Sequence, residues 1–154
     1  MSTVSDYQII ELVYADQYTR IQRALRLCDQ QTVLLRRLNH DNSTVKHLYR
    51  FTYGYELLKR FDHPNIIKVL DWLESDEDPL MVLEGSDLID LKSFLADFSD
   101  KQLPIELFFT IAMQLLDALD EVHQERIILK NLHTSSILIQ PESSKVLLKD
   151  FDLS

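Results

Sequence analysis

Glycine is scarce in this sequence, which contains only Gly54 and Gly85 among its 154 residues. A loop that brings its backbone close to a phosphate group is usually built on glycine, because a residue without Cβ leaves the N–H groups accessible and adopts positive φ freely. The sequence therefore lacks the glycine-rich loop with which many nucleotide-binding proteins hold phosphates.

Basic residues and cysteine are also few. The 16 Lys and Arg stand against 25 Asp and Glu, which gives a net charge of −9, so neither a nucleic acid nor an anionic membrane is an expected partner. The single cysteine, Cys28, excludes an internal disulfide and suits a reducing compartment, so we expect a cytoplasmic protein. No apolar run approaches the roughly 18 residues of a membrane span, and the first residues do not have the pattern of a secretory signal.

The first half of the chain has the pattern of a strand-rich lobe with one helix. Three β-rich segments separated by short polar turns predict an antiparallel meander over residues 7–14, 20–27 and 31–38. Apolar residues spaced at threes and fours then predict a helix that ends before Pro64. Two further strands are expected over residues 66–74 and 79–84.

The second half predicts a mainly helical lobe. Residues 87–98 and 103–125 are expected to be helices, and the second has a core stripe made of Phe108, Ile111, Leu115, Leu119 and Val122. A polar loop and a small hairpin over 137–140 and 145–151 follow. The fold class is therefore α+β, with an N-terminal lobe over residues 1–85 and a partial C-terminal lobe over 86–154.

Two segments resemble eukaryotic-type Ser/Thr protein kinases. "ELLKRFDHPNIIKVLDWLE" is similar to the end of the N-lobe helix and the next strand of these kinases. "LDEVHQERIILKNLHTSSILI" with "VLLKDFDLS" is similar to the run from a long helix through the catalytic loop to the DFG motif. The resemblance extends over nearly the whole chain from Tyr7. It implies a kinase-like fold: a five-stranded antiparallel N-lobe sheet with one helix, then the first part of the C-lobe.

The resemblance implies ATP and Mg²⁺ as cofactors, but the positions that bind phosphate are altered. The glycine-rich loop corresponds to "LVYADQYTRI", in which Tyr14, Asp16 and Thr19 stand where glycines usually stand. Arg36 takes the place of the third-strand lysine, and an arginine is longer and forked. The glutamate that pairs with that lysine is replaced by Gly54, so the usual ion pair is not expected.

The adenine-binding positions are apolar and larger than usual. Leu34 stands where a small alanine is expected, and with Ile21 and Leu138 it is predicted to form an apolar column that fills part of the slot. The hinge from Glu84 to Ser86 would offer backbone groups to ATP.

The segment that corresponds to the catalytic loop is present, but most of its catalytic residues are replaced. Asn131 stands at the position of the catalytic base, although an amide does not accept a proton at neutral pH. His133 replaces the phosphate-steadying lysine, and Ser136 replaces the metal-binding asparagine. Asp150 remains at the metal-binding position of the DFG motif, where it could hold a cation or simply close a turn, and Asp152 replaces the DFG glycine.

The packing positions persist by contrast. The residues that match the apolar column joining the lobes of a kinase are all hydrophobic: Leu58, Val69, Leu129 and Phe151. We therefore expect the chain to keep the kinase-like fold and to lack phosphoryl transfer.

A complete kinase continues beyond the DFG motif, whereas this sequence ends at Ser154. We therefore expect the face made of Ile111, Leu115 and Leu119 to need cover from a protein partner or from further domains of the same chain. The position of the module resembles N-terminal kinase-like domains of large bacterial multidomain signalling proteins. Three functions stay open: a catalytically impaired regulatory or protein-interaction module, a divergent ATP-binding Ser/Thr kinase, and a fragment without independent function.

Overall fold

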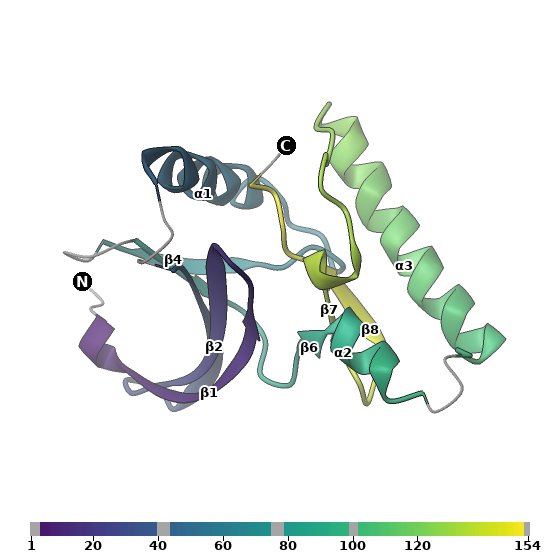
Figure 1. The fold of residues 1–154 in the computed structure, drawn as a ribbon, viewed down its shortest axis with the longest axis horizontal. Helices are drawn as coiled ribbons and strands as arrows, with labels where there is room; N and C mark the ends of the chain where they lie inside the picture. The colour runs from purple at the N-terminus through teal and green to yellow at the C-terminus, as the bar shows by residue number, and fades with distance from the viewer. Residues whose placement is uncertain (1–3, 40–43, 75–78, 99–101, 153–154) are drawn as a thin grey trace.

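A five-stranded antiparallel sheet forms the N-terminal lobe of the computed structural model, which describes residues 4–39, 44–74, 79–98 and 102–152 (Figure 1). The strand order is β1-β2-β3-β5-β4, as the resemblance implied. The strands are β1 (Tyr7–Ala15), β2 (Thr19–Arg26), β3 (Gln31–Leu38), β4 (Val69–Leu73) and β5 (Leu80–Leu83). The predicted meander is confirmed, and β4 is shorter than the predicted segment 66–74.

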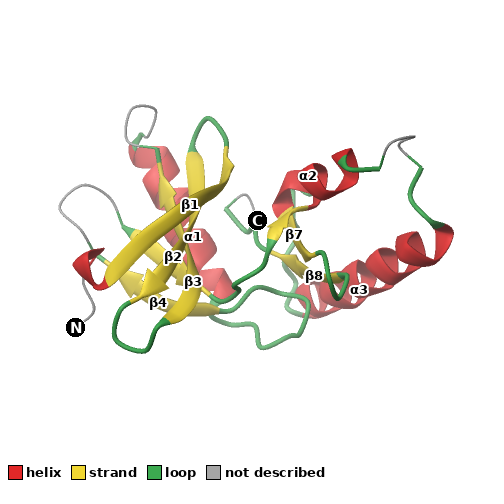
Figure 2. Cartoon of the chain, turned by 90° about the horizontal axis from the view of Figure 1, so that it is seen from below, coloured by secondary structure: helices red, strands yellow, loops and turns green. Residues whose placement is uncertain are grey.

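Helix α1 (Val45–Leu58) packs against one face of this sheet (Figure 2). Its buried residues, Phe51, Gly54, Leu57 and Leu58, lie at the spacing of one helical face. Leu34 and Leu35 of β3 point to opposite sides of the sheet and belong to two different hydrophobic clusters, of which the one with Leu34 also contains the α1 residues. The sheet therefore has a core on each face, and the face under α1 is the one that leads to the second lobe.

The C-terminal lobe combines a small sheet with two helices. The sheet has the order β6-β7-β8, and the elements are β6 (Ile89–Asp90), α2 (Leu91–Ala96), α3 (Ile105–Gln124), β7 (Ile137–Gln140) and β8 (Lys145–Leu148). The helix predicted over 87–98 was too long at its start. Asp90 pairs with Leu138 of β7 and caps α2, since its carboxylate accepts the N–H of Ser93 at 2.9 Å. No helix in the described ranges is long and apolar enough to cross a bilayer.

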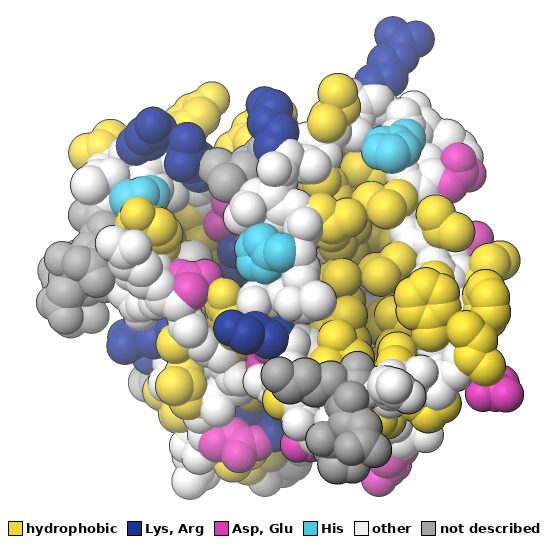
Figure 3. Space-filling model, turned by 45° about the vertical axis from the view of Figure 1, so that its right-hand side comes forward, with side chains coloured by type: hydrophobic (Ala, Val, Ile, Leu, Met, Phe, Trp, Pro, Cys, Tyr) yellow, Lys and Arg dark blue, Asp and Glu magenta, His cyan; other side chains and the backbone are white. Residues whose placement is uncertain are grey.

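The face of α3 that meets the core differs from the predicted stripe. Ile111 and Val122 are buried as expected, but Phe108 is 50% exposed, so its assignment to the core is wrong. The uncovered apolar residues of α3 are instead Ile105, Phe108, Phe109, Met113 and Leu116, and hydrophobic side chains gather on this side of the molecule (Figure 3). The expectation that the face made of Ile111, Leu115 and Leu119 needs outside cover is likewise wrong, because Ile111 is buried and the other two are partly buried against the core.

Backbone hydrogen bonds tie the two lobes together beside β8. Ile67, which precedes β4, donates its N–H to the carbonyl of Leu148 at 3.0 Å, and Leu148 donates to the carbonyl of Asn65 at 2.9 Å. The side-chain amide of Asn65 also donates to the carbonyl of Val146 at 2.9 Å. The chain after β8 then runs between the lobes toward α1 (Figure 1), which fixes where the DFG-like residues lie.

One hydrophobic cluster extends through both lobes. It contains Leu58 and Phe151 as buried members, with Val69 and Leu129 packed against it as partly buried ones. The rings of Phe61 and Phe151 lie 5.3 Å apart between their centroids. The four apolar positions expected to join the lobes therefore share a single core.

Gly85, in the connection after β5, has a φ of +113°. A Cβ at this residue would lie 2.3 Å from Cδ1 of Leu88, which packs beside Leu34. We predict that Gly85→Ala lowers the free energy of unfolding by about 1–3 kcal/mol, because alanine adopts this conformation only with strain and must displace Leu88.

Urea denaturation of the chain would measure this change. The control is Ser86→Ala, an exposed neighbour that should alter the stability by less than about 0.5 kcal/mol. Equal stabilities of the Gly85→Ala variant and the parent chain would contradict the prediction.

Candidate functional site

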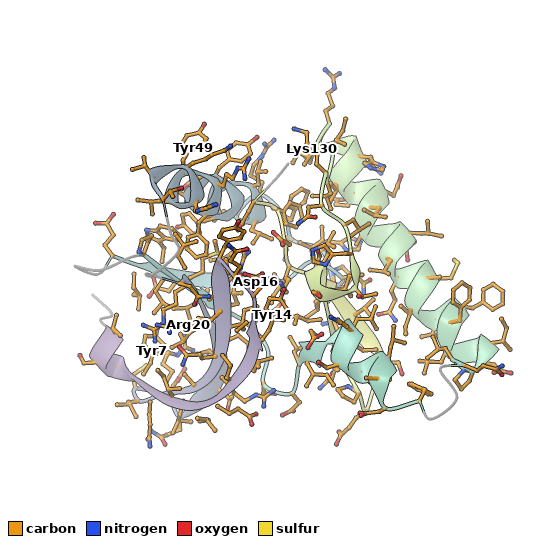
Figure 4. The ribbon with its side chains drawn as sticks, in the orientation of Figure 1. Tyr7, Tyr14, Asp16, Arg20, Tyr49 and Lys130 are labelled. Carbon is orange, nitrogen blue, oxygen red and sulfur yellow. The ribbon has the colours of Figure 1, made fainter. Side chains whose placement is uncertain are left out.

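The turn between β1 and β2 faces the C-terminal lobe and is closed by Asp16 instead of glycine (Figure 4). The Asp16 carboxylate accepts the N–H of Tyr18 at 2.8 Å and that of Thr19 at 2.7 Å. It also accepts the hydroxyl of Tyr14 at 3.0 Å. The turn that corresponds to the glycine-rich loop therefore uses its own N–H groups internally, so these donors are not free to meet a phosphate.

The same hydrogen bonds control the ionisation of Asp16. Partial burial raises the pKa of Asp16, but the N–H donors of Thr19 and Tyr18, together with the Tyr14 hydroxyl, outweigh it and hold this pKa below its ordinary value. Burial and the neighbouring Asp16 raise the pKa of Tyr14 to about 12. At neutral pH the turn therefore carries a carboxylate and a neutral phenol.

Arg36 of β3 is the buried cation of the site, with 1% of its side chain exposed. Its two terminal nitrogens donate to the two carboxylate oxygens of Asp152, at 3.1 and 2.8 Å, and its guanidinium carbon lies 5.4 Å from the centroid of the Phe51 ring. Burial lowers the pKa of Arg36, but Asp152 and Asp150 raise it above its usual value, so this side chain stays charged. The carboxylates that pair with Arg36 therefore belong to the segment after β8.

Ile21, Leu34 and Leu138 are all fully buried and belong to the same cluster. Leu88, which was not singled out from the sequence, packs beside Leu34 from the connection after β5. At the hinge, Glu84 uses its own N–H to bond the carbonyl of Lys68 at 3.0 Å, while Ser86 is exposed. The side chains of Ile21, Leu34 and Leu138 are therefore covered by other parts of the protein.

The catalytic-loop residues are held by bonds among themselves. Ser136 is fully buried and donates its hydroxyl to the carbonyl of Asn131 at 2.9 Å, while the N–H of His133 donates to Ser136 at 3.4 Å. The side chains of Asn131 and His133 are exposed. Asn131 lines a cavity of about 200 Å³ together with Arg36, Asp150 and residues of α1.

Lys149 also belongs to the site, although the sequence did not predict it. It is 1% exposed, and its ammonium lies 4.5 Å from the centroid of the Tyr14 ring. Burial and the charge of Arg36 lower the pKa of Lys149 to about 8, although the carboxylates of Asp150, Asp152 and Asp16 oppose this. Its position directly before the DFG-like turn could have indicated that it belongs to the site. Its burial could not be predicted, because it depends on residues distant in sequence.

These residues do not fit Mg²⁺ and ATP. The residues at the adenine positions are buried, the N–H groups of Tyr18 and Thr19 are bonded to Asp16, and the hydroxyl of Ser136 is bonded to a backbone carbonyl. Asp150 lies 3.5 Å from the guanidinium of Arg36. Within the described ranges no three His, Cys, Asp or Glu side chains are grouped so as to hold a metal ion.

The two lobes, the DFG-like turn between them and the loop around Asn131 define a protein-kinase-like molecule. The family model "Protein kinase domain" matches residues 7–154, and the chain belongs to this family. Domains of this family generally use ATP and Mg²⁺.

Several curated proteins are similar to the chain. The serine/threonine-protein kinase TIO of Arabidopsis thaliana is 35% identical over 148 residues, which cover 96% of this chain and 11% of that protein. Serine/threonine-protein kinase 36 of Pongo abelii is 27% identical over 133 residues, and that of Mus musculus is 26% identical, each match covering 86% of this chain and 10% of the relative. The chain therefore spans about a tenth of these proteins. They come from a plant and two mammals, and the resemblance to bacterial modules stays a prediction.

The bonds of Asp16 predict a pH-dependent contribution to stability. At pH 7, Asp16→Ala should lower the free energy of unfolding by about 1–3 kcal/mol, because two backbone N–H groups lose their acceptor. The folded-state pKa lies below the ordinary 3.8, so this contribution is complete above that value and disappears as the pH falls through the folded-state pKa.

Denaturation of parent and variant at pH 7, 5, 4 and 3 would follow the difference. Asp16→Asn keeps an acceptor without a titrating group, so it should retain much of the stability and remove the pH dependence of this site. A difference between the parent chain and Asp16→Ala that is the same at pH 7 and pH 3 would contradict the prediction.

Proposed function

We propose that this chain is a catalytically impaired protein-kinase domain that acts as a regulatory or protein-interaction module in signalling. The observation that carries the proposal is the pairing of Arg36 with Asp152 and Asp150. Arg36 is the cation that would otherwise orient phosphates, and Asp150 is the carboxylate that would otherwise hold a metal ion. In this pairing the two bind each other. Asn131 at the base position and the filled apolar slot support the same conclusion.

The packing supports a role through binding. The cluster that joins the lobes contains or contacts all four expected apolar positions, which supports a domain whose lobes hold together without a nucleotide. We propose that its partner is a protein or further domains of the same polypeptide, since the relatives are far longer than this chain. A reducing compartment such as the cytoplasm suits the exposed free thiol of Cys28.

The proposal predicts no phosphoryl transfer by this chain. With Mg²⁺, radiolabelled ATP and a general substrate such as myelin basic protein or casein, the incorporated label should stay at the level of a reaction without protein. The physical reason is that an asparagine amide cannot take the proton of the attacking hydroxyl. The control is Asp150→Ala, and transfer by the parent chain that disappears in this variant would overturn the proposal.

A divergent ATP-binding Ser/Thr kinase is the second candidate. The observation in its favour is that Asp150 keeps 19% of its side chain exposed and lines the same cavity as Asn131. The similar proteins are also named as serine/threonine-protein kinases. In this case ATP would have to displace side chains from the slot between Leu34 and Leu138.

Leu34→Ala tests whether the filled slot is what keeps a nucleotide out. The substitution should cost about 2–5 kcal/mol of stability and open space beside Leu138. We expect the melting temperature of this variant to rise with added ATP, by mass action, while that of the parent chain does not change.

The matched control is Leu35→Ala, which removes an equally buried leucine from the cluster on the other face of the sheet. It should lose similar stability and show no response to ATP. A rise in the parent chain itself would favour the second candidate, and no rise in Leu34→Ala would show that the slot is not the barrier. If the chain proves to be a fragment without independent function, the parent chain should melt without a cooperative transition.

A further inference from the structure

The guanidinium of Arg36 lies beside the carboxylate to which the family resemblance assigns a metal ion. Nη2 of Arg36 is 3.5 Å from Oδ1 of Asp150 and 2.8 Å from Oδ2 of Asp152. Nη1 of Arg36 donates to the other oxygen of Asp152 at 3.1 Å. The carboxylate expected to hold Mg²⁺ therefore already has a cation of the protein itself within ion-pair distance.

Gly54 on α1 makes this arrangement possible. A Cβ built on Gly54 would lie 2.3 Å from Oδ1 of Asp152, 3.2 Å from its backbone nitrogen and 3.3 Å from its Cα. Rotating the Asp152 side chain would remove the shortest of these contacts but would break its bonds to Arg36, and the Asp152 backbone would still have to move by a few tenths of an ångström. A larger residue at position 54 therefore disturbs the position that Asp152 occupies.

The three carboxylates of the site already have two positive charges of the protein beside them, which leaves one negative charge unbalanced. In the described part of the chain, the buried cations Arg36 and Lys149 lie within electrostatic reach of three carboxylates, those of Asp16, Asp150 and Asp152. A divalent cation placed at Asp150 would be repelled by both buried cations. A divalent cation there would also compete with Arg36 for the carboxylate of Asp150.

We propose that Arg36 serves as a built-in cation in place of a divalent metal ion, and that Asp152 and Gly54 have exchanged roles to hold it. Asp152 provides the carboxylate that a glutamate of the N-lobe helix would otherwise provide. Gly54 leaves free the space that the glycine of the DFG motif would otherwise leave free. The inference deepens the proposed function, because it explains how the site stays closed. It concerns cation binding and stability, so it is tested without measuring catalysis.

A divalent-cation titration followed by thermal melting tests the first half of the proposal. With up to 10 mM MgCl₂ or MnCl₂ against a constant ionic strength, the melting temperature of the parent chain should not change. In Arg36→Met, two neighbouring carboxylates lose their cation, and the same salts should raise the melting temperature by several degrees through binding to the folded state.

The parent chain decides the outcome even if Arg36→Met does not fold. A rise of melting temperature with Mg²⁺ or Mn²⁺ in the parent chain that disappears in Asp150→Asn would overturn the proposal, because it would show a metal ion at Asp150 beside Arg36. A folded Arg36→Met variant without any response would overturn it as well. Loss of phosphoryl transfer is not among these readouts, so the proposed function can fail independently.

A reciprocal substitution tests the second half. Gly54→Glu alone should lower the melting temperature by about 5 °C or more, since the new side chain collides with Asp152, and Asp152→Gly alone should do so because it leaves Arg36 unpaired. The double variant Gly54→Glu/Asp152→Gly should recover much of the combined loss, because a glutamate from α1 can then reach Arg36.

The matched control is Gly54→Gln/Asp152→Gly, which relieves the same collision and has nearly the same shape without the charge. Recovery in the glutamate variant beyond that in the glutamine variant would support the exchange of roles. Additive losses in the double variant, or equal melting temperatures of the glutamate and glutamine double variants, would overturn it.

Discussion

The guanidinium of Arg36 is charged and almost wholly buried, and such a group persists in a protein only where carboxylates surround it. Its two partners come from the chain after β8, which passes close to α1 at Gly54. The pair therefore fixes three elements at once: the third strand of the N-lobe sheet, the N-lobe helix, and the DFG-like turn. The relative position of the two lobes depends on it, together with the backbone bonds at Leu148.

The sequence predicted more of the architecture than of the site. Strands and helices followed from residue periodicity, which is a local property, and the predicted five-stranded sheet is present. The start of α2 was misplaced because the two residues Ile89 and Asp90 pair with a strand about fifty positions later, a contact that no local pattern contains. The exposure of Phe108 was not predicted for a similar reason. An apolar stripe shows which face of a helix is hydrophobic, but not which part of that face another element covers.

At the site, each departure from the kinase pattern could be seen in the sequence, but their relation could not. The replacements at Arg36, Gly54 and Asp152 were each visible as separate losses. They compensate one another only in space, because Arg36 and Asp152 are 116 positions apart and meet through the fold. Lys149 was overlooked for the same reason, since its ammonium lies over the ring of Tyr14 from the first strand. Sequence comparison at single positions thus suggests decay, whereas the geometry shows a replacement set of interactions.

The use of glycine in this chain agrees with that interpretation. Where a phosphate-binding loop would need bare N–H groups, Asp16 takes those N–H groups for itself. Gly54 and Gly85, the two glycines of the sequence, occupy places where a Cβ would meet Asp152 or Leu88 at 2.3 Å. Both glycines therefore serve the packing of the protein against itself: one admits the carboxylate that holds Arg36, and the other admits the leucine beside the apolar slot. Backbone freedom that a kinase uses to approach a ligand is used here to bring parts of the protein itself into contact.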